Sequence, residues 1–180
     1  MRGIKTISIS ILTIGLLAGS AVGVAAQDER PVFFSWTFGE AEGEFVPGTF
    51  DEAPGWMTMR DFMQVDLIEA DDERASGLLT VAFNADSWGD PEVNAPEIIE
   101  VTSTSQRLVN DGGSWSGTGS AVSHVAAGDG VDPDGAGMVT LTGEDGYEGL
   151  TLILLTIPGE DGGTGFILPS VPPVPEPPAE

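Results

Sequence analysis

Short apolar runs recur along the chain between residues 32 and 168, separated by Gly, Asp, Asn and Pro, and helical periodicity is nearly absent. That pattern is typical of many β-strands joined by turns. The two-residue period is clearest in Gly77–Asn84, where Leu79, Val81 and Phe83 share one face. Eight strands are predicted in this way: Val32–Phe38, Trp56–Leu67, Gly77–Asn84, Glu97–Val109, Ser114–Val125, Met138–Thr142, Gly149–Ile157 and Gly165–Leu168.

These strands, in a chain of 180 residues, predict one all-β domain over residues 27–168. Eight antiparallel strands in about 140 residues fit a closed barrel or a sandwich. We expect a single antiparallel β-barrel of about eight strands. The segment Pro169–Glu180 contains six prolines and predicts an extended, disordered tail.

Two of the strands have unusual faces. In the strand that begins at Ser114, Trp115 shares a face with Gly117 and Gly119, which predicts a corner where aromatic side chains from adjacent strands fill the space. Gly149–Ile157 is apolar on both faces, so we expect it to be covered on both. A contact with a second copy of the chain is one source of that outer cover, and this strand is the predicted site of a homo-oligomer.

Residues 1–26 have the features of a secretory signal peptide. Arg2 and Lys5 form a basic start, Ile7–Leu17 is apolar, and Ala25-Ala26 suits cleavage before Gln27. No later segment is apolar over about 18 residues, the length that spans a membrane. The sequence therefore predicts a secreted, extracellular protein with no membrane anchor after cleavage.

The charge of the chain excludes several functions. Its formal net charge is −23, and removal of the leader would leave 29 Asp and Glu against four Arg. Such a surface repels nucleic acid and anionic lipid. The absence of cysteine excludes disulfides, thiolate metal sites and a cysteine nucleophile.

Few side chains suggest chemistry. His124 is the one imidazole, with no second His or Cys to share a metal and no G-x-S-x-G motif, and we expect it at the surface. Asp129, Asp132 and Asp134 are the best candidates for a Ca²⁺ site, but their spacing is not that of an EF-hand, and an acidic hairpin tip is the simpler interpretation. Glu160-Asp161 and Asp71–Arg74 are also interpreted as solvated turns. No catalytic, cofactor or metal residue is therefore assigned.

A buried acid inside the barrel would be more informative than any surface pair, and Asp61 and Asp66 are the candidates. Strict alternation places Asp61 on one face with Met57, Met59, Met63, Val65 and Leu67. If that face is interior, Arg74 or Arg107 is the available partner for the charge. The alternative is that Asp61 lies where the strand leaves the core.

Three segments resemble a group of secreted, mostly actinobacterial proteins with an allene-oxide-cyclase-like or dirigent-like β-barrel: Arg74–Gly77, Leu108–Gly117 and Leu141–Leu150. The resemblance covers about half of the predicted domain and implies a barrel. Plant members of that superfamily cyclise a fatty-acid epoxide or direct phenoxy-radical coupling, but none of their catalytic positions is matched here. A shared fold alone does not license an activity. Independently, Asn110-Asp111-Gly112-Gly113 predicts a tight hairpin, and Trp115 and Tyr147 are expected to be structural.

Barrels of about eight strands are just wide enough to hold one small ligand. We therefore expect a non-enzymatic protein that binds a small apolar molecule, or one with an extracellular structural role. A cyclase or isomerase acting on a hydrophobic substrate inside the barrel is one alternative. A cation-dependent adhesive or matrix protein is the other.

Overall fold

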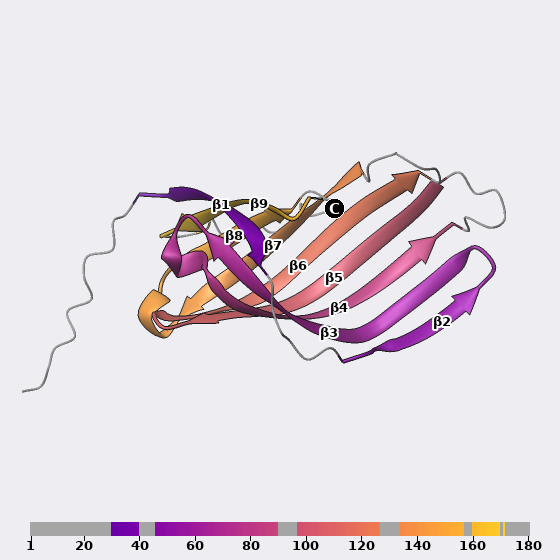
Figure 1. The fold of residues 1–180 in the computed structure, drawn as a ribbon, viewed down its shortest axis with the longest axis horizontal. Helices are drawn as coiled ribbons and strands as arrows, with labels where there is room; N and C mark the ends of the chain where they lie inside the picture. Colours follow the sequence, from indigo (N-terminus) through magenta and orange to yellow (C-terminus); the bar gives the residue numbers. More distant parts are fainter. Residues whose placement is uncertain are drawn as a thin grey trace, which may run out of the picture.

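The computed structural model describes residues 30–39, 46–89, 97–126, 134–156, 160–169 and 171, and within them the chain is almost entirely β-strand. Two short 3₁₀ turns, η1 (Glu73–Ala75) and η3 (Asp145–Tyr147), lie at the same end of the sheet (Figure 1). The predicted leader and most of the proline-rich tail lie outside the described residues. The strands are β1 (Val32–Gly39), β2 (Thr49–Ala53), β3 (Trp56–Ala70), β4 (Gly77–Trp88), β5 (Glu97–Asn110), β6 (Gly113–Ala126), β7 (Asp134–Glu144), β8 (Thr151–Thr156) and β9 (Gly162–Leu168).

The described strands form one antiparallel sheet in the order β1-β9-β8-β7-β6-β5-β4-β3-β2 (Figure 1). Because β1 pairs with β3 as well as with β9, the sheet closes into a ring that contains every strand except β2. The prediction of an all-β, antiparallel fold is confirmed. Each of the eight predicted strands corresponds to a strand of this ring.

The strand that the sequence did not predict, β2, lies outside the ring and pairs with the first half of β3. All five of its residues are exposed, so it has no buried face and no apolar alternation. Its extended conformation follows from pairing with β3 rather than from its own pattern.

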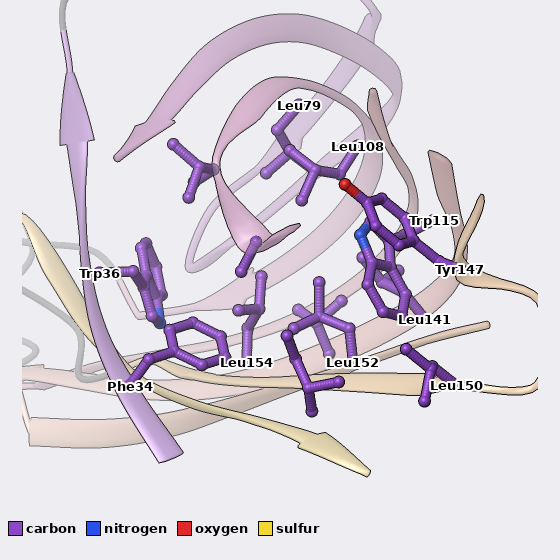
Figure 2. Packing of buried hydrophobic residues seen from close by; sticks show 14 of the residues in the cluster. Phe34, Trp36, Leu79, Leu108, Trp115, Leu141, Tyr147, Leu150, Leu152 and Leu154 are labelled. Carbon is purple, nitrogen blue, oxygen red and sulfur yellow. The ribbon is translucent and has the colours of Figure 1, made fainter. Parts of the chain in front are cut away.

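Closure of the sheet places one face of each strand inside the ring. On β4, Leu79 and Val81 are buried, whereas Leu78 is 55% exposed on the outer face. Figure 2 shows large side chains from opposite strands pointing toward one another in the interior. The labelled members of this core are Phe34, Trp36, Leu79, Leu108, Trp115, Leu141, Tyr147, Leu150, Leu152 and Leu154.

A β-bulge in β3 changes which residues share a face. The register with β4 shifts between Met59 and Phe62, and Asp61 at the bulge has φ 55°. The two residues opposite one partner residue reverse the alternation at this point. The predicted grouping of Asp61 with its apolar neighbours on one face is therefore wrong. Beyond the bulge, Gln64 and Asp66 lie on the inner face, because they pair with the inward-facing positions of β4.

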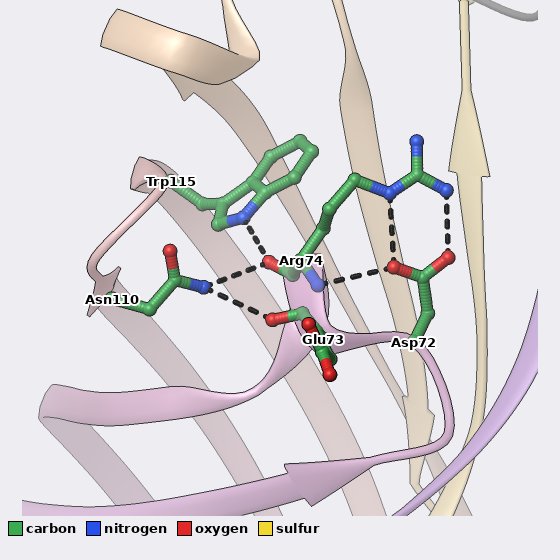
Figure 3. A network of polar contacts seen from close by, with 5 residues as sticks. All are labelled: Asp72, Glu73, Arg74, Asn110 and Trp115. Atoms are coloured by element: carbon green, nitrogen blue, oxygen red, sulfur yellow. Dashed lines mark hydrogen bonds and ion pairs between the residues drawn. The ribbon is translucent and has the colours of Figure 1, made fainter.

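One end of the ring, where η1 and η3 lie, is closed by the packing of these turns; we call it the closed end. Figure 3 shows the main polar contacts there. Trp115, fully buried, donates from Nε1 to the Arg74 carbonyl at 2.8 Å. Asn110 Nδ2 donates to the carbonyls of Glu73, Arg74 and Ser76 at 3.3, 3.2 and 2.7 Å. These bonds satisfy backbone groups that leave the strand ladder at η1.

The β5–β6 hairpin contributes the rest of the closed end. Asn110 Oδ1 accepts hydrogen bonds from the Tyr147 hydroxyl at 2.7 Å and from the Gly112 amide at 3.0 Å. Tyr147 stacks on Trp115 with ring centroids 4.7 Å apart. A Cβ at Gly112 would lie 2.2 Å from the Tyr147 hydroxyl, so the glycine is needed for this contact. The predicted hairpin is confirmed, and both aromatic residues belong to the core.

The surroundings of the glycines in β6 differ from the prediction that aromatic side chains fill the space beside them. A Cβ on Gly117 would meet the Thr140 carbonyl oxygen at 2.1 Å, and one on Gly119 would meet Val139 and Thr104 side-chain atoms at 2.7 and 2.8 Å. The space is thus occupied by the β7 backbone and small side chains, not by aromatic residues. Glycine at these positions lets β6 and β7 approach inside the ring.

The strand predicted to be apolar on both faces is β8. Leu152 and Leu154 are buried in the interior, while Ile153 and Leu155 on the outer face are half-buried. Ile157 lies outside the described residues. The prediction that the inner face of β8 is covered is confirmed. The contact with a second copy expected on its outer face stays a prediction.

Asn110→Ala is expected to lower the free energy of unfolding by about 2–3 kcal/mol, because it leaves the hydroxyl of buried Tyr147 and part-buried carbonyls of η1 without partners. Urea denaturation followed by tryptophan fluorescence measures the change. Asp111→Ala at the adjacent, exposed position is the matched control and should shift stability by less than about 0.5 kcal/mol. Equal effects of the two substitutions would contradict this role of Asn110.

Candidate functional site

The interior of the ring contains a cavity of about 190 Å³. It lies away from the closed end, toward the end where β3–β6 continue past the last residue pairs of β8, which we call the open end (Figure 1). Its apolar lining consists of Trp36, Phe38, Leu79, Val81, Phe83, Val139 and Leu154. Its polar lining consists of Gln64, Asp66, Thr102, Thr104, Gln106 and Thr156.

The polar residues of β5 that line the cavity are paired with small residues of β6. Thr102, Thr104 and Gln106 pair with Ala121, Gly119 and Gly117 respectively. Each inward-facing residue of β5 here is thus opposite a very small residue of β6. At the next pair toward the closed end, Leu108 is opposite Trp115, and the interior is fully packed.

The polar groups of the cavity are only partly satisfied. Gln64 Nε2 donates to Asp66 Oδ2 at 2.7 Å. Gln106 Nε2 donates to Thr104 Oγ1 at 3.0 Å. Gln106 Oε1 is buried and has no hydrogen-bond partner in the described part of the chain. Since nearly all buried polar atoms in proteins are paired, a water or another bound molecule in the cavity is the expected donor to Gln106 Oε1.

A second inward acid lies farther along β5. Glu100 Oε2 accepts a hydrogen bond from Ser87 Oγ at 3.0 Å, and Oε1 accepts a weaker one from Thr102 Oγ1 at 3.4 Å. Thr102 also lines the cavity. Polar groups therefore continue from the cavity along the inner face of β5 toward the open end.

Aromatic side chains form the opposite wall. Trp36 contacts Phe38 edge to face, with centroids 5.1 Å apart, and its Nε1 donates to the Thr164 carbonyl at 3.1 Å. A second hollow of about 630 Å³ shares Trp36 and Thr156 with the cavity. Glu160 and Asp161, both exposed, lie at its rim.

Of the two acids singled out from the sequence, the structure places Asp66 in the cavity and Asp61 outside it. Asp61 is exposed at the bulge, where its backbone amide donates to Asn84 Oδ1 at 2.8 Å. The arginine partners expected for an interior Asp61 are paired with other acids. Arg74 is paired with Asp72 and Arg107 with Glu144, at 2.6 and 2.9 Å.

The other candidates do not come together in one place. His124 is half-buried on the outer face of β6, opposite Asp134 of β7. Asp129 and Asp132 lie outside the described residues. Within the described ranges, no group of three His, Cys, Asp or Glu side chains is arranged to hold a metal ion.

Sequence reasoning missed Gln64, Glu100, Thr102, Thr104 and Gln106. The sequence signal that could have identified the residues of β5 is the alternation of polar residues along this strand. However, Ser103, Ser105 and Arg107 on the opposite face of β5 are polar too, so the pattern did not tell which face lies inside.

Asp72 belongs to the closed end rather than to the cavity. Arg74 donates to its carboxylate from Nε at 2.9 Å and from a terminal nitrogen at 2.6 Å, and these bonds hold the pKa of Asp72 below its usual value. The same pairing raises the pKa of Arg74. Asp72 Oδ1 also accepts from the Arg74 amide, which fixes the start of η1.

A second acid with a perturbed pKa lies on the outer face of the ring. Hydrogen bonds from Ser116, Arg107 and Ser114 hold the pKa of Glu144 below its usual value. These contacts link β5, β6 and β7 near the closed end. They indicate a structural role and no reaction centre.

No protein-family model, curated protein or solved structure matches the chain. The fold and the cavity therefore define the class of protein by themselves: an all-β protein whose sheet closes around a small, partly polar interior cavity. In the described part of the chain, no helix has the length and apolar character needed to cross a membrane.

Asp72→Asn is expected to lower the urea midpoint at neutral pH, because the ion pair with Arg74 is lost. The pKa of Asp72 is lower in the folded than in the unfolded state, so its stabilisation is present above the unfolded value of about 3.9 and disappears as pH falls through the folded pKa. The difference between wild type and variant should therefore shrink between about pH 6 and about pH 3. Glu73→Gln, at the exposed neighbouring position, is the control, and a pH-independent difference would contradict the assignment.

Proposed function

We propose that this is an exported β-barrel protein that binds a small, largely apolar molecule inside the ring. The observation that carries the proposal is the interior cavity beside the unpaired Gln106 Oε1. Ligand sites are typically concave and mostly apolar, with a few polar groups that fix the orientation of the ligand. The cavity has this composition, with aromatic and aliphatic walls and a polar strip from β3 and β5.

The size of the cavity limits the ligand. Its volume is about 190 Å³. An apolar cavity of about 150 Å³ in another protein holds benzene, so one ring-sized group fits here. The adjoining hollow at Trp36 and Thr156 offers room for a larger substituent.

A second candidate function is favoured by Asp66. A carboxylate that lines a cavity with apolar walls, with one oxygen bound by Gln64 Nε2, has the surroundings of a general base. An isomerase that moves a proton on a hydrophobic substrate would use Asp66 in this way. In this mechanism, the proton taken from one carbon returns to another, so no oxidant or reductant is needed.

The binding proposal predicts that benzyl alcohol produces a saturable shift of the Trp36 indole N–H in heteronuclear NMR spectra. Trp36 lines the cavity, and the Trp36→Phe spectrum assigns the signal. Val81→Phe should abolish the shift, because the larger ring fills the cavity. Leu78→Phe adds a ring at an exposed position of the same strand and should leave binding unchanged.

No saturable shift in the wild-type protein at millimolar benzyl alcohol would overturn the binding proposal and leave a surface role. Loss of binding in both variants would show that the effect of Val81→Phe is not local. Retained dispersion of the amide signals confirms that each variant is folded.

The isomerase alternative predicts that the protein accelerates exchange of the α-protons of cyclohexanone with D₂O, because a general base at Asp66 would remove them reversibly. Proton NMR follows the loss of the α-signal. Asp66→Asn should reduce the rate to that of buffer, and Glu69→Gln on the outer face of β3 should not. A wild-type rate equal to that of buffer would argue against this alternative and leave the binding proposal intact.

A further inference from the structure

The inner face around the cavity carries charge of one sign. Asp66 lines the cavity, and Glu100 follows on the inner face of β5. Their hydrogen-bond partners are neutral: Gln64 for Asp66, and Ser87 and Thr102 for Glu100. Neither carboxylate is paired with a Lys or Arg side chain among the described residues.

The arginines of the ring form ion pairs with acids outside the cavity. Arg60 is paired with Asp86 at 2.5 Å, across the outer face of β3 and β4. Arg74 and Arg107 are paired with Asp72 and Glu144 at the closed end. No basic side chain lines the cavity in the described part of the chain, so an anionic ligand would find no compensating charge there.

The acceptor atoms and the aromatic rings of the cavity favour a ligand that donates hydrogen bonds and carries positive charge. Gln106 Oε1 is a buried acceptor without a partner among the described residues, and the Asp66 carboxylate beside it accepts one hydrogen bond, from Gln64 Nε2. The faces of Trp36, Phe38 and Phe83 carry the negative side of the aromatic quadrupole, which attracts cations. Only a ligand that brings N–H or O–H groups satisfies the acceptors, and only a cation also offsets the charge of Asp66.

We infer that the ligand is a small organic amine, bound as an ammonium ion, with an apolar body of about one ring. The ammonium group lies between Asp66 and Gln106, and the ring lies against Val81, Phe83 and Leu154. This inference rests on the proposed binding function. Glu160 and Asp161 at the adjoining hollow, and the net charge of −23, increase the local concentration of cations near the open end.

The test compares benzylamine, benzyl alcohol and benzoate, which share one ring and differ in charge. The dissociation constant of each is measured at near-physiological salt from the shift of the Trp36 indole N–H. We expect benzylamine to bind about tenfold to hundredfold more tightly than benzyl alcohol, and benzoate not to bind. Near-physiological salt screens exposed charges over about 8 Å, which suppresses adsorption of the amine to the acidic surface.

Asp66→Asn should reduce the affinity for benzylamine to that for benzyl alcohol while changing the latter less than about threefold. Glu69→Gln removes one charge from the exposed outer face of the same strand and should retain the preference for the amine. Because the three ligands are compared on the wild-type protein, the test does not depend on the folding of any variant.

The outcomes separate this inference from the proposal on which it rests. Binding of benzyl alcohol and benzylamine with equal affinity would overturn the amine inference and leave the binding function standing. Absence of binding for all three compounds would overturn both. An amine preference that survives Asp66→Asn but is lost in Glu69→Gln would place the amine on the outer surface and overturn the inference.

Discussion

The fold depends on β1, which pairs with β9 along one edge and with β3 along the other. Its contact with β3 is short, from Trp36 opposite Ala70 to Gly39 opposite Leu67, yet it turns an open sheet into a ring. Without β1, the edges of β9 and β3 would expose unpaired backbone groups, and the inner side chains would have no opposite wall. Phe34 and Trp36 show how close this fit is, since a Cβ on Gly165 would lie 2.3 Å from the Phe34 ring.

The two ends of the ring differ in how their interiors are packed. At the closed end, Trp115, Tyr147 and Asn110 fill the interior and satisfy the backbone of η1 (Figures 2 and 3). Toward the open end, Thr and Gln on β5 are opposite glycine and alanine on β6, and these polar side chains line the cavity. The closed end is thus held by both packing and hydrogen bonds, and the cavity lies away from it.

The cavity also explains why polar residues are placed inside a small domain. Placing Asp66 and Gln106 beside apolar walls is unfavourable unless their polar groups are paired, and within the described chain Gln106 Oε1 is buried without a partner. A core that served stability alone would be better filled by Leu or Val at these positions. The unpaired Gln106 Oε1 is therefore the physical basis of the proposal that a ligand binds in the cavity.

The sequence by itself determined the all-β class, the eight strands of the ring and the Asn110–Gly113 hairpin, because alternation and turn chemistry are local properties. Which face of each strand lies inside follows from the pairing of strands that are distant in the sequence. The bulge at Asp61 reverses the faces of β3, so alternation did not tell which of the two candidate acids, Asp61 or Asp66, lies inside. Because β5 is polar on both faces, its pattern did not identify Gln106 as interior. The missed strand β2 has no buried face and forms only against β3. Register and closure are set by pairing between distant segments, and a local pattern carries no information about that pairing.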